Sequence, residues 1–250
     1  MPERDSSGIS AVLGILMVLA ILASVITVIV VYKLPVIEKR AEFRHELEEI
    51  RAFRSFEKVY LGEPSDVNLE LGAPSLPLLH VKMDSSLRVW NSGSIVVRIS
   101  YTLNNSSGTV TFRGRTFGVN LSVYPSLLPY YKLAMTPLGI VAYQSGFREN
   151  LTNFTSQYLE SCIVNDGNTV KVYVDNYTVN GHLTNFTFAG TGFASLSAGV
   201  EENTTLTVRA TKLTVSFEIS DSLFGSRTVS RSFSNVSLMV IHRNYSVFVG

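Results

Sequence analysis

The sequence contains few of the residues that usually carry enzyme chemistry. Its 250 residues include one cysteine and four histidines, which excludes an intramolecular disulfide and a zinc site built from cysteines. The single cysteine, Cys162, lies in a strand-like run from Tyr158 to Val164, where we expect a buried side chain rather than a reactive thiol. The Gly-x-Ser-x-Gly, His-Glu-x-x-His, phosphate-loop and EF-hand motifs are also absent. We therefore expect no enzyme activity, no cofactor and no metal site.

Charged residues are scarce as well. They make up 16 % of the chain, and the 21 basic residues nearly cancel the 20 acidic ones. A chain with so little net charge has no general electrostatic attraction for nucleic acid. We expect no nucleic-acid partner.

A long apolar run near the start of the chain extends from Ile9 to Tyr32. Its 24 residues contain no charged side chain. As a helix they would extend about 36 Å, enough to cross a hydrocarbon core about 30 Å thick. The run is too long for the apolar part of a secretory signal, and Lys33-Leu34-Pro35 follows it instead of a small-residue cleavage site. We expect a transmembrane helix that remains as an anchor.

The residues at the start of this run resemble a known family. A short polar leader, residues 1–8, ends in Gly8, and the run then opens Ile9-Ser10-Ala11-Val12-Leu13-Gly14. Over residues 6–60 the chain is similar to the archaeal type IV pilin and archaellin superfamily, especially its pilin-like membrane proteins of uncharacterised function. The resemblance implies that a prepilin peptidase cuts between Gly8 and Ile9 on the cytoplasmic side. Ser7 departs from the family pattern, which usually has a basic residue there.

Four small residues of the apolar run, Ala11, Gly14, Ala20 and Ser24, would let a neighbouring helix approach closely. One interpretation is self-association, or packing against other pilin-like subunits, in a filament. The other is a solitary or weakly associating anchor. The sequence leaves both interpretations open.

The composition and pattern of residues 33–61 predict an amphipathic juxtamembrane helix. This segment is rich in Glu, Arg and Lys, and Pro35, near its start, either kinks the helix or lies in its first turn. An apolar stripe recurs at helical spacing and could pack on the following domain or on neighbouring subunits; it consists of Phe43, Leu47, Ile50 and Phe53. Gly62 and Pro64 mark the end of the helix.

From Val67 onward apolar and polar residues alternate, which is typical of β-strands. Asn180-Gly181, between two such runs, predicts a tight hairpin. Between the predicted strands we expect an apolar connection at Pro125–Pro137 and either a short helix or a loop at Arg148–Glu160. We expect an all-β, sandwich-like domain over residues 62–250. The predicted strands are Ser94–Leu103, Gly108–Arg113, Phe117–Tyr124, Gly139–Gln144, Thr169–Val179, His182–Phe188, Thr204–Ile219 and Ser226–Val249.

Ten of the fifteen asparagines begin an Asn-x-Ser/Thr sequon, against about three expected by chance, and all ten follow the apolar run. This favours an exported domain that carries glycans. The charge on the two sides of the run favours the opposite orientation, because Lys33, Lys39, Arg40 and Arg44 all follow it. We give the sequons more weight, since large domains are translocated largely regardless of flanking charge. The sequon asparagines are Asn104, Asn105, Asn120, Asn150, Asn153, Asn176, Asn185, Asn203, Asn235 and Asn244.

These features predict a mainly β protein with a cytoplasmic leader (1–8), a transmembrane helix (9–32), a juxtamembrane helix (33–61) and an extracellular β-domain (62–250). Two functions follow. The first is a structural subunit or minor component of a type IV pilus-like filament at the cell surface. The second is a solitary membrane-anchored module for extracellular binding or adhesion that does not polymerise.

Overall fold

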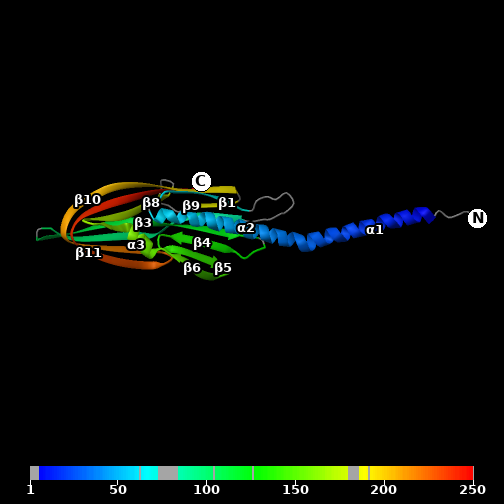
Figure 1. Ribbon diagram of the computed structural model, residues 1–250, viewed down its shortest axis with the longest axis horizontal. Helices are drawn as coiled ribbons and strands as arrows, with labels where there is room; N and C mark the ends of the chain where they lie inside the picture. Colours follow the sequence, from blue (N-terminus) through cyan, green and yellow to red (C-terminus); the bar gives the residue numbers. More distant parts are fainter. Residues whose placement is uncertain are drawn as a thin grey trace, which may run out of the picture.

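The computed structural model describes residues 6–61, 63–72, 84–103, 105–125, 127–179, 186–190 and 192–249. A single long helical rod carries the N-terminus at one end of the molecule and a β-rich head at the other (Figure 1). The expected fold class, a mainly β chain with one long apolar N-terminal helix, is confirmed at this level.

The rod consists of α1 (Ser6–Val28), the π-helical turn η1 (Ile29–Lys33), α2 (Leu34–Ser55) and the 3₁₀ turn η2 (Phe56–Leu61). Pro35 is the second residue of α2 and has no N–H to donate to the preceding helical turn. Just before it, the Leu34 N–H bonds to the Ile29 carbonyl, five residues back, so the wider π turn accommodates the proline ring. The helix therefore continues through the predicted junction without a break.

The described part of the head forms one 11-stranded sheet in the order β6-β5-β4-β3-β2-β10-β11-β8-β7, with β1 paired to β10 and β9 to β2. All neighbours are antiparallel except β8 and β11. The strands are β1 (Ser65–Leu71), β2 (Asp84–Leu103), β3 (Ser106–Tyr124), β4 (Tyr131–Thr136), β5 (Gly139–Gln144), β6 (Phe147–Asn153), β7 (Ile163–Asp166), β8 (Thr169–Val179), β9 (Phe186–Gly190), β10 (Gly192–Asp221) and β11 (Gly225–Val249), and the helix α3 (Thr155–Cys162) connects β6 to β7.

β10 is an unusually long strand that curves along its course (Figure 1). Its 30 residues would extend about 100 Å if straight, far longer than a typical strand. β10 instead pairs with β1 over 192–198 and with β2 over 212–221, and a register shift between Thr204 and Leu206 interrupts its pairing with β11. Such irregularities increase the bend of a strand pair. The β10–β11 hairpin accordingly curves around the far end of the head (Figure 1).

Local chemistry fixes the tight turns. In the β10–β11 turn the Asp221 carboxylate accepts hydrogen bonds from the N–H groups of Leu223 (2.8 Å) and Phe224 (3.0 Å). Ser145 and Gly146, between β5 and β6, both have positive φ, as a type I′ hairpin requires. The hairpin predicted at Asn180-Gly181 lies outside the described residues.

Several strand predictions are confirmed. β5 and β8 have the predicted bounds, whereas Gly108–Arg113 and Phe117–Tyr124 belong to one strand, β3. The apolar connection contains β4. The strand-like run around Cys162 is wrong in part, because its first residues form α3 and only Ile163 and Val164 belong to a strand; Cys162 is buried as expected.

The end of the helical rod belongs to the core of the head. Phe53, Phe56, Val59 and Tyr60 are fully buried in the same core as the strands. The Tyr60 ring lies 5.1 Å from the Phe117 ring. Phe117 in turn contacts Tyr177, whose ring stacks on the Tyr245 ring. A domain boundary at residue 62 would separate these core side chains from the strands they pack against, so the head extends back into α2.

Candidate functional site

The predicted packing residues lie on a helix that nothing in the described structure covers. Ala11, Ala20 and Ser24 are exposed, and a Cβ atom added at Gly14 would have no neighbour within 4 Å. The Ser24 hydroxyl donates to the Ala20 carbonyl (2.8 Å), so this polar side chain is satisfied within the helix. α1 is long and apolar enough to cross a membrane.

The predicted cleavage residues, Gly8 and Ile9, lie at the start of α1, which begins at Ser6. They are in the same continuous helix as the packing residues. Cleavage between them would leave Ile9 at the free end of the rod, about 17 Å before Ala20 at the helical rise of 1.5 Å per residue.

The sequon asparagines divide by exposure. Asn105, Asn150, Asn153, Asn203 and Asn235 are exposed, and Asn176 and Asn244 are half-buried. Asn120 is buried within β3, where it is only 8 % exposed. Asn104 and Asn185 lie outside the described residues.

The face of α2 that meets the head is acidic, which differs from the predicted apolar stripe. Glu42, Glu46 and Glu49 are buried there together with His45, whereas Phe43 of the predicted apolar stripe is 54 % exposed. Of that stripe, Phe53 is fully buried and Ile50 packs against the core. The sequence does contain a signal for this acidic face, because Glu42, Glu46 and Glu49 are spaced i, i+4 and i+7, which places all three on one side of a helix.

Specific contacts hold this acidic face. The Leu127 N–H donates to Glu42 (3.0 Å) and the Ser85 hydroxyl donates to Glu49 (3.1 Å). His45 Nε2 lies 3.6 Å from a Glu49 oxygen and has no hydrogen-bond partner among the described residues. Burial raises the pKa of the Glu49 carboxyl to about 8, and burial together with Glu42 raises the pKa of Glu46. Among the residues described, no group of three or more His, Cys, Asp or Glu side chains is arranged to hold a metal ion.

A second polar cluster lies in the core between β8, β11 and α3. Arg243 donates to both Asp175 oxygens (2.6 and 3.0 Å), and the Tyr158 hydroxyl donates to one of them (2.7 Å). The guanidinium also lies 4.7 Å from the centre of the Tyr173 ring. The pKa of the neighbouring Cys162 thiol is raised by burial and by Asp175, which disfavours the nucleophilic thiolate. The cluster is a buried, hydrogen-bonded arrangement that contributes to the structure of the head.

The described structure exposes an apolar helix, one side of α2 and many polar side chains of the sheet. No family model, curated protein or solved structure was found to match this chain.

Proposed function

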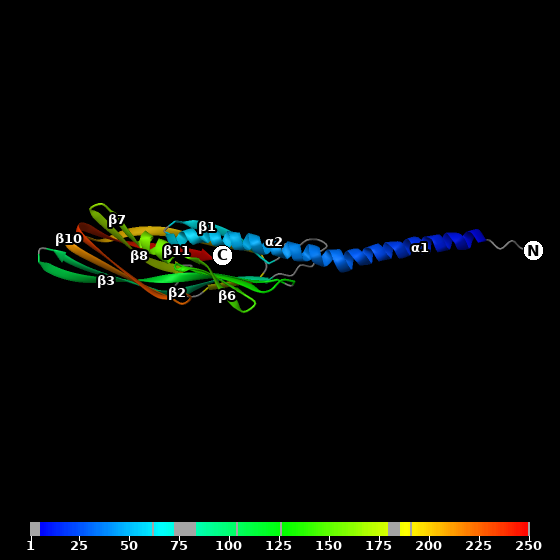
Figure 2. The ribbon, with the colours of Figure 1, turned by 60° about the horizontal axis from the view of Figure 1, so that its bottom comes forward.

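We propose that this protein is a pilin-like, membrane-anchored surface protein, serving as a structural subunit or minor component of a type IV pilus-like filament. One observation carries the proposal. The helix runs unbroken from α1 to the core of the head, yet its apolar N-terminal half stands entirely clear of the head (Figure 2). A helix that is apolar on all sides has to be covered by lipid or by other helices.

The positions of the small residues support self-association. Ala11 and Ala20 are nine residues apart, which at 100° per residue places them on opposite sides of α1. Each side would then admit a neighbouring helix. Contacts between different faces of identical subunits generate an open helical array when they do not close into a ring. Such an array would have the α1 helices inside and the heads outside.

The exposed sequons support an outward-facing head. Five described sequon asparagines are exposed on the head, none of them in the helical rod. Protease added to intact cells should therefore degrade the head while cytoplasmic proteins survive. Digestion of the head only after lysis would contradict the outward orientation and would agree with the orientation that the basic residues after α1 predict.

Assembly through α1 is tested on the full chain extracted in mild detergent. We expect oligomers, and we expect Ala20→Leu to weaken them because the added bulk separates the helices. Val12→Leu is the matched control, since it adds bulk on a face about 80° from Ala20 and 100° from Ala11. The melting temperature of the head should not change in either variant. A monomeric wild-type chain, or equal effects of both variants, would contradict the proposal.

The second candidate is a solitary adhesion module. It is favoured by β6, an edge strand whose side chains are mostly exposed, including Phe147 at 80 %. An open strand edge can pair with an extended peptide of a partner. Under this alternative the full chain stays monomeric in detergent and the Phe147→Ser change weakens adhesion to a surface.

A further inference from the structure

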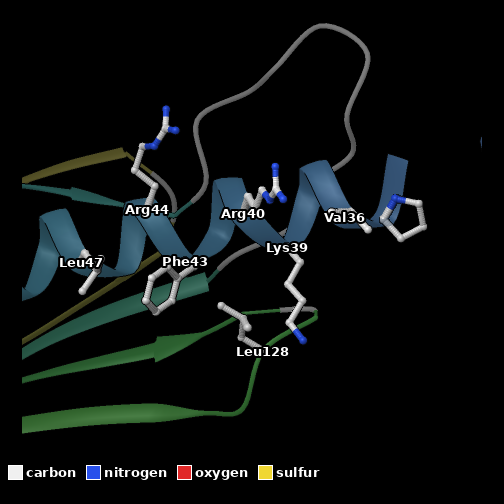
Figure 3. A pocket seen from close by; sticks show the side chains of 8 residues that line it. Val36, Lys39, Arg40, Phe43, Arg44, Leu47 and Leu128 are labelled. Atoms are coloured by element: carbon white, nitrogen blue, oxygen red, sulfur yellow. The ribbon is translucent and has the colours of Figure 1, made fainter. Parts of the chain in front are cut away.

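A groove on the exposed side of α2 lies immediately beyond the apolar helix. Seven of its eight lining residues come from the start of α2, and the eighth, Leu128, comes from the connection between β3 and β4. Its volume is about 680 Å³. Figure 3 shows Phe43 and Lys39 pointing toward the side where Leu128 lies, with Arg40 and Arg44 projecting from the other side of the helix. The lining residues are Pro35, Val36, Lys39, Arg40, Phe43, Arg44, Leu47 and Leu128.

The lining combines apolar side chains with charge of a single sign. Three of the eight residues are cations, Lys39, Arg40 and Arg44, and none is acidic. None of these cations forms an ion pair with a residue that the structure describes. Phe43 and Val36 are about half exposed despite being apolar. The chemistry that complements this lining is an anionic group joined to an apolar chain.

The groove also lies at the height of a lipid headgroup. Val36 is four residues beyond Tyr32 and Lys39 seven, which places them about 6 and 10 Å along the helix axis from the end of the apolar run. A bilayer's headgroup region adds about 5–8 Å to each side of the hydrocarbon core. Helical side chains lean toward the N-terminus of the helix, here toward the membrane, and a lysine stem can reach back further.

The neighbouring part of the head has the composition of a membrane-interface surface. The β3–β4 connection, which supplies Leu128, also exposes Leu127 and is flanked by Tyr124 and Tyr130, whose rings lie 4.9 Å apart. Tyrosines are enriched where proteins meet the headgroup layer. The Leu127 N–H bond to Glu42 holds this connection against α2.

We propose that the groove binds an anionic phospholipid, with its phosphate at Lys39 and an acyl chain along Val36, Phe43 and Leu128, while Arg40 and Arg44 add positive charge from the other side of the helix (Figure 3). The proposal rests on the proposed function only in requiring that α1 spans a membrane. A second copy of α1 is a poorer occupant, because that helix has no charge to complement the three cations. Lipid binding would also give the basic residues that follow α1 a role besides setting the orientation.

The test uses the full chain in non-ionic detergent and native mass spectrometry with short-chain phosphatidylglycerol, phosphatidylcholine or inorganic phosphate. We expect phosphatidylglycerol to bind at least tenfold more tightly than the other two. Each cation is worth about a factor of five near an anionic lipid, so Lys39→Gln with Arg44→Gln should weaken binding about 25-fold. Phe43→Ser should weaken it as well, through the acyl chain. Arg51→Gln, an exposed cation of α2 outside the groove, is the matched control and should have no effect.

Equal affinity for the two lipids, or unchanged binding in the double variant, would overturn the proposal. Phosphate binding as tight as phosphatidylglycerol would also overturn it, because the groove would then be a site for free anions. A dimer that Phe43→Ser dissociates, without lipid selectivity, would identify a second copy as the occupant. Ala20→Leu separates this test from that of filament assembly, since it should weaken oligomers and leave lipid selectivity intact.

Discussion

Replacing Glu49 with glutamine tests the acidic contact between α2 and the head. The Glu49 side chain is buried, accepts a hydrogen bond from Ser85 and faces His45. Burial is the main cause that raises its pKa to about 8, and the charges of Glu46 and Glu70 add to the effect. Glutamine keeps a carbonyl acceptor for Ser85 and cannot ionise.

The expected pH dependence is the reverse of the usual one for a carboxyl group. Between an unfolded pKa near 4.5 and a folded pKa of about 8, the folded chain holds a proton that the unfolded chain has released. The free energy of unfolding therefore falls as pH rises through this range. The full difference amounts to about 5 kcal/mol at most, at 1.36 kcal/mol for each pH unit. For a chain of this size that corresponds to a melting temperature lower by about 10–20 °C.

The assay is the thermal unfolding of the full chain in detergent, followed by the β-sheet circular dichroism signal from pH 5 to pH 9. We expect Glu49→Gln to match the wild type near pH 5 and to melt at progressively higher temperature than it toward pH 8. Glu48→Gln, at an exposed position of the same helix, is the control and should follow the wild type. A Glu49→Gln variant that is less stable at every pH would show that the folded protein holds an ionised Glu49, and would refute the reasoning.

Three further predictions concern the head. Arg243→Met should destabilise it by about 3–5 kcal/mol, because Asp175 would be left as an unpaired buried charge, and adding Asp175→Leu should restore much of the loss in a melting experiment. A fragment of residues 62–250 lacks four fully buried side chains, whose burial contributes about 6–12 kcal/mol, so it should not fold. A fragment of residues 34–250 keeps them and should give a cooperative melting transition. Equal melting of the two fragments would contradict the assigned core. Cys162 should resist a thiol reagent until the head is unfolded, and rapid labelling of the native chain would contradict its burial.

The parts of the fold that sequence reasoning predicted are those set by local pattern. An uncharged run of 24 residues is a helix candidate wherever it lies, and the period-two pattern of Thr169–Val179 gave the bounds of β8. The strand predicted to begin at Ser94 is longer in the structure, because β2 begins at Asp84 and contains Gly93. β2 and β3 continue past it through a register shift, and a Cβ there would collide with the Ser220 backbone, so this glycine permits close strand approach rather than ending a strand.

The candidate surfaces were less predictable because they depend on tertiary packing. Helical spacing identified the stripe containing Phe43, but only the folded head shows that part of this stripe is exposed and that Glu42, Glu46 and Glu49 are buried instead. The groove needs Leu128, which is 85 residues from Phe43 in the chain. Asn120 carries the same sequon pattern as the exposed asparagines, and only its place in β3 shows that it is buried.

The N-terminal residue of the protein recovered from its native membrane tests the proposed function most directly. A pilin-like subunit is cut before its apolar helix, and Gly8 stands immediately before that run. Intact mass measurement combined with N-terminal sequencing distinguishes the two outcomes. We predict a mature chain that begins at Ile9; a chain that still carries residues 1–8 would contradict the pilin-like assignment and leave the solitary anchored module.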